Sequence, residues 1–277
     1  MKLIADSGST KTDWCLVSKD QAFDFQTQGI NPFHQSRPEI HSILETELAP
    51  QFPREAIVTS IDFYGAGCTP EQSPRLAEAL HAVFGADTDV SVGSDMLGAA
   101  RSLCQHDEGI ACILGTGANS CLYDGRDIVS NVSPLGYILG DEGSGAYIGK
   151  RLIGDVLKQQ LSPRICQLFH DETQLDGPTI IRKVYREAVP NRFLGQVSQF
   201  CHRHREEPEI QHLLVDCFTQ FFTRNVVNYQ RPDLPVNFVG SIAWFYADEI
   251  RLAAQPLGLN IGTIVRAPMA GLIEYHG

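Results

Sequence analysis

The sequence of 277 residues contains no long apolar run and no paired cysteines, and each gap excludes a class of protein. The apolar start, MKLIADSG, is too short for a signal-peptide core, and no other run is long enough to span a bilayer. The eight cysteines form no C-x-x-C pair, and several lie in apolar runs such as IACIL around Cys112. We therefore expect a cytoplasmic protein with buried, reduced thiols, without a disulfide or zinc framework.

Positive charge is also scarce. The chain has 22 Lys and Arg against 33 Asp and Glu, a formal net charge of −11. Such a chain repels nucleic-acid phosphate and anionic membrane surfaces, so we expect neither as a partner. Hydrophobic residues make up 43% and charged residues 20%, which is typical of a soluble globular protein. The length suffices for one large or two medium domains, each with its own core.

Two common nucleotide-binding motifs are missing. The P-loop pattern G-x-x-x-x-G-K-[ST] needs glycines where Ala5 and Thr10 stand, although Lys11 and Thr12 supply its last pair. The dinucleotide pattern G-x-G-x-x-G fails twice, because GAGCTP at 65–70 ends in proline and GTGANS at 115–120 lacks the third glycine. A nucleotide site in this chain must therefore have another design.

The residue pattern alternates between strands and helices, and it does so in two cycles. In the first cycle we expect strands at 2–6, 13–17, 57–64 and 89–93, and helices at 38–49, 75–84 and 96–104. The second cycle begins near residue 110 with GIACIL, GTG, SCLYDG and DIVSNV. It continues with helices over most of 143–160, 175–229 and 244–255, strands near 236–241 and 261–266, and a closing helix in 267–277. We assign the apolar stripe in 208–229 to core packing, and the polar stretch 201–204 to a helix end. Two similar cycles predict two related halves in an α/β fold with mixed sheets.

The loop D-x-G-S-T between the first two expected strands has the composition of an anion site. A tight turn at Gly8 turns backbone N–H groups outward, and Ser9 and Thr10 add hydroxyl donors. Asp6 ends the strand, where a carboxylate can hold a hydrated Mg²⁺. The second cycle has a small loop, Gly115–Gly117, at the equivalent place. Each loop alone is typical of an ordinary β-turn, but the pair predicts a site for nucleotide phosphates.

The order DSGSTKTD, GSDMLGAAR, LGTGANS, GYILGDEGSG, FVGSIAWF resembles the N-acetylglucosamine kinases. These belong with the benzoyl-CoA-reductase-activator-type ATPases to the hexokinase, actin and heat-shock-chaperone superfamily. The resemblance spans nearly the whole chain. It implies two ribonuclease-H-like lobes, 1–105 with the closing helix 267–277 and 106–266, with ATP, Mg²⁺ and a sugar in the cleft between them. It also implies a homodimer.

The resemblance assigns roles in nucleotide binding. The first phosphate loop is matched by Asp6, Gly8, Ser9, Thr10 and Lys11, with Asp6 as the metal ligand. The second phosphate loop is matched by Gly115, Thr116 and Gly117. The adenosine loop is matched by Gly240 and Ser241, with one glycine where many relatives have two.

The resemblance also assigns the sugar side. Asp95 matches the general base, because a carboxylate near the sugar hydroxyl can orient it and accept its proton late in the transfer. Its simpler interpretation is a helix N-cap, and both roles are compatible. Asn31, Gly136 and Asp141 match sugar contacts. From the residues alone, Asn31 is a turn residue before a proline, and Asp141 begins a helix with acids in its first turn.

The sequence thus predicts an ATP- and Mg²⁺-dependent kinase of an amino sugar, with the 6-hydroxyl of N-acetylglucosamine as the expected acceptor. N-acetyl hexosamines, muramic-acid derivatives and anhydro sugars all remain open as substrates. One alternative is an ATPase that activates an iron–sulfur partner, which would need paired cysteines. The other is a non-catalytic sugar or nucleotide sensor, against which Asp95 and the two phosphate loops argue.

Overall fold

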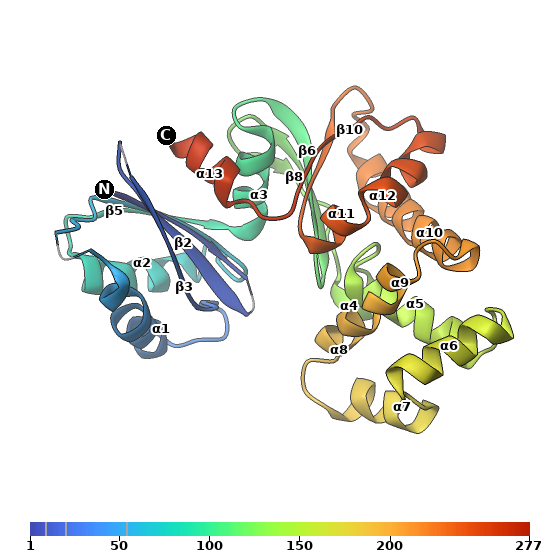
Figure 1. Ribbon diagram of the computed structural model, residues 1–277. Helices are drawn as coiled ribbons and strands as arrows, with labels where there is room; N and C mark the ends of the chain where they lie inside the picture. The colour runs from blue at the N-terminus through green and yellow to red at the C-terminus, as the bar shows by residue number, and fades with distance from the viewer. Residues whose placement is uncertain (9, 20, 54) are drawn as a thin grey trace. The chain divides into compact units, whose positions relative to one another are not determined.

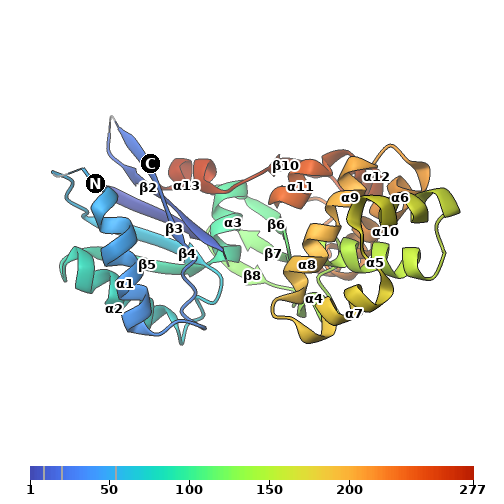
Figure 2. The ribbon, with the colours of Figure 1, turned by 60° about the horizontal axis from the view of Figure 1, so that its bottom comes forward.

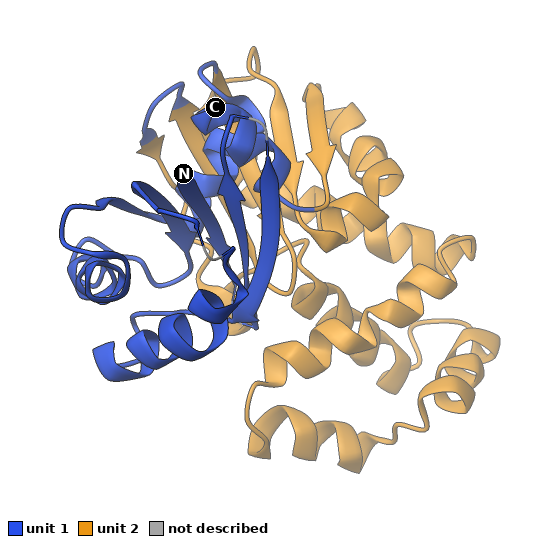
Figure 3. Cartoon of the chain, turned by 60° about the vertical axis from the view of Figure 1, so that its left-hand side comes forward, with its two compact units in different colours: residues 1–107, 124–128, 267–277 blue, residues 108–123, 129–266 orange. Residues whose placement is uncertain are grey.

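The computed structural model describes residues 1–8, 10–19, 21–53 and 55–277. The chain forms two compact units, coloured separately in Figure 3. The first comprises Met1–Asp107, Asp124–Ile128 and Ala267–Gly277, and the second Glu108–Tyr123 and Val129–Arg266. Each unit contains one five-stranded sheet. The predicted α/β fold with two mixed sheets is confirmed, whereas the predicted lobe boundaries at 105/106 and 266/267 stay predictions.

The sheet of the first unit has the order β3-β2-β1-β4-β5. Its strands are β1 (Lys2–Ser7), β2 (Lys11–Val17), β3 (Ala22–Gln28), β4 (Ser60–Gly65) and β5 (Asp89–Ser94). β1, β2 and β3 pair antiparallel, whereas β1, β4 and β5 pair parallel. Parallel neighbours need crossovers, supplied by α1 (Arg37–Ile43), η1 (Leu44–Leu48), η2 (Ala49–Gln51) and α2 (Ser73–Phe84). The sequence analysis missed β3, an edge strand with one fully buried residue.

Helices cover both faces of this sheet, as Figures 1 and 2 show. Leu3 and Ala5 of β1 pack in the cluster that includes α1 and α2. Ile4 between them packs with Leu272 of α13 (Met269–His276), beside α3 (Asp95–Cys104). Because side chains alternate along a strand, Asp6 shares the face of Ile4. The first predicted site residue therefore lies on the side of the sheet that α3 and α13 cover.

The sheet of the second unit has the order β10-β9-β6-β7-β8. Its strands are β6 (Glu108–Leu114), β7 (Ala118–Asp124), β8 (Ile128–Ser130), β9 (Val236–Val239) and β10 (Ile261–Val265). β9 lies parallel to both β6 and β10. When β6 to β10 are matched with β1 to β5, the two sheets have the same strand order. This agreement supports the predicted relation between the two halves.

Most helices of the second unit lie between β8 and β9. They are α4 (Gly136–Leu139), α5 (Gly145–Leu157), α6 (Pro163–Thr173), α7 (Gly177–Arg186), α8 (Pro190–Val197), α9 (Gln199–Arg203), α10 (Pro208–Arg224) and η3 (Val226–Tyr229). After β9 come α11 (Ser241–Phe245), α12 (Ala247–Ala254) and η4 (Gln255–Leu257). The sequence analysis missed α4, a single turn, and α6, which buries only Ile165 and Phe169 completely.

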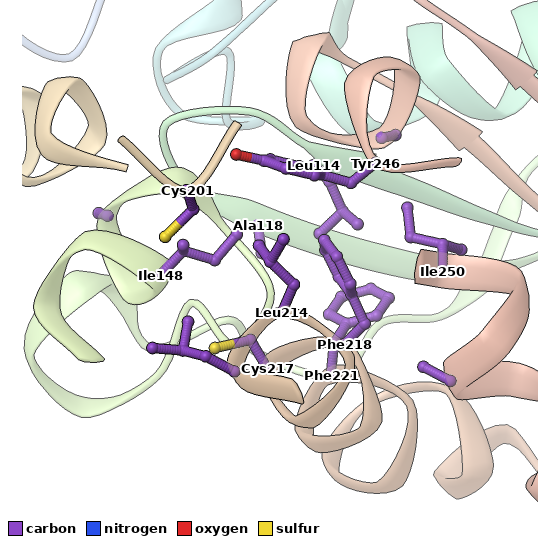
Figure 4. Close-up of a cluster of buried hydrophobic side chains, with 14 of the residues drawn as sticks. Leu114, Ala118, Ile148, Cys201, Leu214, Cys217, Phe218, Phe221, Tyr246 and Ile250 are labelled. Carbon is purple, nitrogen blue, oxygen red and sulfur yellow. The ribbon is translucent and has the colours of Figure 1, made fainter. Parts of the chain in front are cut away.

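The core of the second unit is built on α10. Phe218, Phe221 and Phe222 are fully buried, and the Phe222 ring meets Phe238 of β9 edge-on at 5.9 Å between centroids. Figure 4 shows part of this cluster, which also buries the thiols of Cys201 and Cys217. The stripe in 208–229 is thus confirmed as core packing. Seven of the eight cysteines are buried, and Cys166 is half-buried. In the described part of the chain, none of the helices has both the length and the apolar character to cross a membrane.

Candidate functional site

The β1–β2 hairpin of the first unit is fastened by two buried hydroxyls. Its turn is closed by the N–H of Gly8, which donates to the carbonyl of Lys11 at 3.0 Å. Ser7 Oγ and Thr12 Oγ1 lie 2.7 Å apart, and both accept the N–H of Ile30, at 3.0 and 3.2 Å. Ser7 Oγ also lies 2.8 Å from the carbonyl of Ile30, to which it donates. Because these buried groups satisfy one another, the hairpin is fixed to the segment that follows β3.

The outer residues of this hairpin are accessible. Gly8 and Thr10 are exposed, and Ser9 lies outside the described residues. Lys11 Nζ pairs with an Asp13 carboxylate oxygen at 2.9 Å, and both side chains are largely accessible to solvent. The loop thus presents backbone groups and one lysine at the surface, as a phosphate loop requires.

The carboxyl ends of β1, β4 and β5 bring two predicted carboxylates to one edge of the sheet. Ser7 is paired with Gly65, and Gly65 with Ser94, so the three strands end side by side. Asp6 stands one residue before this line, and Asp95 directly after it. Burial, and next the negative charges of Asp13 and Asp95, raise the pKa of Asp6 to about 7. The site therefore concentrates negative charge where solvent is partly excluded.

Asp95 occupies the first position of α3 and is not its N-cap. The cap is Ser94, whose Oγ accepts the N–H of Leu97 at 3.1 Å. Asp95 Oδ1 accepts the N–H of Met96 at 2.8 Å. Burial raises the pKa of Asp95, and the bond from Met96 lowers it by a smaller amount. The interpretation of Asp95 as the capping residue is wrong, because the neighbouring serine takes that role.

Asn31 is held in a compact turn after β3. Its N–H donates to Gln35 Oε1 at 2.7 Å, and its Oδ1 accepts the N–H of Phe33 at 3.0 Å. The side chain lies against Gly67, where a Cβ would come within 2.1 Å of Asn31 Oδ1. Gly67 also has φ +77°, which favours glycine. The turn role of Asn31 is confirmed, and its sugar contact stays a prediction.

In the second unit, the Gly115–Gly117 loop is seated on the N-terminus of α5. The N–H of Gly145 donates to the carbonyl of Gly115 at 2.9 Å, and that of Ala146 to Thr116 at 3.1 Å. Within the loop, the N–H of Gly115 donates to the carbonyl of Gly117 at 3.0 Å. The first N–H groups of a helix have no partner inside it. Here the loop carbonyls satisfy them, which fixes the loop.

Asp141 fastens the same loop from the other side. Its Oδ1 accepts the N–H of Ala118 at 3.3 Å, and its own N–H donates to the carbonyl of Pro134 at 2.9 Å. Burial raises the pKa of Asp141, and the bond from Ala118 lowers it less. The backbone of Asp141 has φ +56°, a strained conformation for a residue with a side chain. A carboxylate placed in this way orders the loop, whatever its contact with a sugar.

The prediction that a helix begins at Asp141 and Glu142 is wrong. α5 begins at Gly145, and Ser144 caps it by accepting the N–H of Tyr147 at 3.1 Å. Glu142 instead turns back to Arg224 of α10, with 2.7 Å between its Oε1 and the guanidinium Nε. The acids therefore lie before the helix, and the serine that follows them takes the capping position.

Gly136, the other predicted sugar residue, begins the single turn of α4. It has φ +73°, and Leu135 before it has φ +60°. Ile138 and Leu139 in the same turn are each 70% exposed. The structure thus separates Gly136, on an exposed turn, from the buried Asp141 that follows it closely in the chain.

A cavity of about 450 Å³ lies within the second unit, and it contains three of the predicted residues. Its lining is formed by Gly115, Thr116, Gly145, Arg192, Gly195, Gln196, Ser198, Gln199, His202, Arg203, Ser241, Ile242, Phe245 and Tyr246. Gly240 stands just outside it, before α11, with φ +125°. A Cβ at Gly240 would lie 2.2 Å from the carbonyl oxygen of Leu114. Only glycine therefore lets the predicted adenosine loop approach the end of β6 so closely.

The sequence analysis missed the wall of this cavity that α8 and α9 supply. Arg192, Gln196, Gln199 and His202 lie on these helices, and no motif marks them. The His202 ring packs against Phe245 of α11, with 4.8 Å between ring centroids. α9 ends at Arg203, which confirms the stretch 201–204 as a helix end. No group of three metal-ligating side chains occurs among the residues that the structure describes.

Two contacts hold the α9 and α11 walls together. The Arg205 guanidinium donates to both carboxylate oxygens of the buried Glu249, each at 3.0 Å, and to the carbonyl of Phe245 at 3.1 Å. Tyr246 Oη donates to the carbonyl of Ser198 at 3.3 Å. A bidentate pair of this kind fixes geometry as well as distance. These contacts therefore join the segments next to α9 and α11, whose residues line the cavity.

The two units offer different chemistry. The cavity has the size of a small-molecule site and combines aromatic rings, amides and the side chains of Arg192 and Arg203, of which Arg203 pairs with Glu172. These groups suit a planar ligand that carries negative charge. The first unit offers carboxylates, Asp6 and Asp95, at a sheet edge beside a polar hairpin. Such carboxylates can hold a divalent cation and accept a proton.

Comparison with solved structures finds a relative that is similar to this chain over its whole length. No family model matches the chain, and no curated protein matches it. A Porphyromonas gingivalis structure, provisionally described as an N-acetylglucosamine kinase, is 49% identical over 100% of this chain and 98% of its own, with a TM-score of 0.94. A Chromobacterium violaceum structure with the same provisional description is 17% identical, covers 100% and 98%, and has a TM-score of 0.75. MreB 5 of Spiroplasma citri bound to AMPPNP is 11% identical, covers 99% and 94%, and has a TM-score of 0.59. The last two show the fold alone.

Proposed function

Because the chain belongs to the N-acetylglucosamine kinase-like family of the hexokinase–actin superfamily, we propose that it is an ATP-dependent sugar kinase. The expected reaction transfers the γ-phosphoryl group of ATP to the 6-hydroxyl of N-acetylglucosamine. The observation that carries this proposal is the cavity of the second unit, where the Gly115–Gly117 loop and the start of α11 converge. The provisional description of the 49% identical relative supports the choice of sugar.

The nucleotide is assigned to that cavity. Thr116 and Ser241 bring hydroxyls and backbone N–H groups to one end, where phosphates would be bound. The facing rings of Phe245 and His202 offer a surface on which a purine can stack. Arg192 brings positive charge to the same cavity. These groups bind and orient the nucleotide, which is most of what phosphoryl transfer asks of a protein.

Asp6 fits the role of a magnesium ligand. Its negative charge is disfavoured by burial and by the carboxylates of Asp13 and Asp95, as its raised pKa shows. A divalent cation would offset that charge, and carboxylate with water is the ligand set that Mg²⁺ prefers. When bound, Mg²⁺ supplies charge neutralisation for the phosphates.

Asp95 is the proposed general base. Its position at the carboxyl end of β5 and the start of α3 holds the carboxylate rigidly, with Oδ1 bonded to the backbone. The raised pKa makes it a better proton acceptor than an ordinary aspartate. Asn31, which stands in the same unit, is proposed to contact the sugar, as are Gly136 and Asp141. A homodimer in the cytoplasm belongs to the same proposal.

The test is ADP release from Mg-ATP against a panel of N-acetyl hexosamines, muramic-acid derivatives and anhydro sugars. We expect N-acetylglucosamine to stimulate release, and its product to be the 6-phosphate. Asp95→Asn should abolish the stimulation, whereas Asp89→Asn, at the exposed opposite end of the same strand, should keep it. ATP hydrolysis that no sugar stimulates would favour an ATPase that acts on a partner. Sugar binding without turnover would favour a sensor.

A further inference from the structure

Tyr64 of β4 lies against both sides of the turn that carries Asp95. The tyrosine is only 1% exposed. A Cβ at Gly93 would lie 3.1 Å from Tyr64 Cδ1, and a Cβ at Gly98 only 2.7 Å from Tyr64 Cβ. Gly93 and Gly98 flank Asp95 in the sequence. The first turn of α3 therefore packs closely against the Tyr64 side chain, on both sides of Asp95.

The hydroxyl of Tyr64 belongs to a network of polar side chains. Arg101 Nη1 donates to Tyr64 Oη at 2.8 Å, and His276 Nε2 lies 2.8 Å from the same oxygen. On its other side, His276 Nδ1 faces Asp62 Oδ2 at 3.3 Å. The network therefore runs Arg101, Tyr64, His276, Asp62.

This network of side chains joins α13, the last helix of the protein, to α3, which bears Asp95. Further hydrogen bonds join the same two helices. Ser102 Oγ donates to the carbonyl of Pro268 at 2.8 Å, and Gln105 Nε2 to that of Gly271 at 3.0 Å. The Arg101 guanidinium also lies over the Tyr275 ring, 5.1 Å from its centroid. α13 thus holds the C-terminal part of α3, from Arg101 to the end of the helix.

We propose that the network Arg101–Tyr64–His276–Asp62 positions Asp95 for the chemical step, so that α13 is required for catalysis although it brings no group to the substrate. This inference rests on the proposed function of Asp95 as general base. Loss of the Tyr64 hydroxyl removes the oxygen that accepts from Arg101 Nη1 and faces His276 Nε2, and so weakens the contacts that join β4, α3 and α13. Arg101 is on the same helix as Asp95, so we expect a shift of α3 that displaces the carboxylate. A displacement of about 1 Å at a catalytic group costs on the order of 10²-fold in rate.

The first test is the kinetics of Tyr64→Phe, which keeps the buried ring. We expect kcat to fall by about tenfold to a hundredfold, while KM for ATP and for sugar changes less than about twofold because binding groups are untouched. Tyr275→Phe is the matched control: it keeps the ring beneath Arg101 and should leave kcat unchanged. In an Asp95→Asn background, Tyr64→Phe should cause no further loss. Equal losses in both backgrounds would overturn the proposal.

A second measurement does not depend on kinase activity. The carboxyl carbon of Asp95 can be followed by NMR through a pH titration. Tyr64→Phe should lower the pKa of Asp95 toward its ordinary value, because a displaced first turn admits water, and Arg101→Lys should do the same if the Tyr64 variant folds poorly. An unchanged titration in both variants would refute the positioning role. A changed titration in a protein that phosphorylates no sugar would refute only the proposed function.

Discussion

The two units have the same strand order, but different contacts hold their equivalent hairpins in place. Between β1 and β2, side-chain hydroxyls of Ser7 and Thr12 tie the hairpin to the next segment. Between β6 and β7, the loop carbonyls of Gly115 and Thr116 receive the first N–H groups of α5. One hairpin is fastened by side chains and the other by backbone. The second arrangement needs a helix N-terminus beside the loop, and α5 supplies it in the second unit.

The crossovers between equivalent strands explain the rest of the difference. In the first unit, residues 29–59 connect β3 to β4, whereas in the second unit residues 131–235 connect β8 to β9. The longer crossover contributes α8 and α9, the walls of the cavity. The shorter one leaves the strand ends of the first unit to Asp6 and Asp95. Under the proposed function, the same sheet would serve proton and cation chemistry in one unit and ligand enclosure in the other.

The largest expected effect comes from substituting Asp95 in the first unit. The described residues that line the cavity of the second unit include no carboxylate. Asp95→Asn keeps the shape of the side chain and removes the proton acceptor, so kcat should fall by about 10²- to 10⁴-fold. ATP binding, which is assigned to the second unit, should be unchanged in a calorimetric titration. If the variant instead loses ATP affinity and keeps kcat, the division of labour between the units is wrong.

Gly240→Ala should damage the cavity and spare the first unit. The new Cβ would lie 2.2 Å from the carbonyl oxygen of Leu114, at a φ of +125° that side chains rarely adopt. We expect a loss of about 1–3 kcal/mol in the free energy of unfolding of the second unit and a loss of about tenfold or more in ATP affinity. Gly154→Ala, in the middle of α5 with open space around it, is the control and should not weaken binding. Equal behaviour of the two variants would contradict the close approach of α11 to β6.

The sequence predicted the strands and loops of both units better than the walls of the cavity. Apolar runs that end in Gly8 or Gly115 loops are local signals, and the structure has hairpins at both places. Arg192 and Gln199 carry no local signal, because α8 and α9 reach the cavity only through the folding of residues 131–235. Asp141 shows a third case. The two acids at 141 and 142 predicted a helix start. In the structure Ser144 caps the helix, and the Asp141 carboxylate instead binds the end of the Gly115–Gly117 loop.

The raised pKa of Asp6 gives the first unit a pH dependence that Asp6→Asn should remove. The carboxyl has a pKa of about 7 when folded against 3.8 as an ordinary side chain, so the folded unit holds its proton longer. Below about pH 3 both states are protonated and nothing is lost. As pH rises toward 7, the unfolded chain releases the proton first, so stability falls and then levels off. In urea titrations, Asp6→Asn should be more stable than the wild type by about 1–2 kcal/mol at pH 8, and the difference should disappear by about pH 3.

Adding Mg²⁺ to the same urea titrations tests whether Asp6 is a metal ligand. Mg²⁺ should stabilise the wild type above pH 7, where Asp6 is ionised, and have no such effect on Asp6→Asn. Stabilisation of both proteins to the same extent would exclude Asp6 as the ligand.

The smallest expected effect tests whether Lys11 serves its neighbour or a phosphate. Lys11 Nζ lies 2.9 Å from Asp13 Oδ2, with side chains 55% and 34% exposed, so Lys11→Ala should change the free energy of unfolding by less than about 0.5 kcal/mol. The equivalent position of the second hairpin is Ala118, so this substitution makes the two hairpins alike. If the lysine contacts a phosphate, KM for ATP should still rise by about three- to tenfold, since an exposed charge-assisted hydrogen bond is lost. Lys11→Arg, which keeps the charge, should recover most of that affinity. A KM unchanged in Lys11→Ala would assign the lysine to Asp13 alone and leave phosphate binding in the first unit to the backbone of the turn.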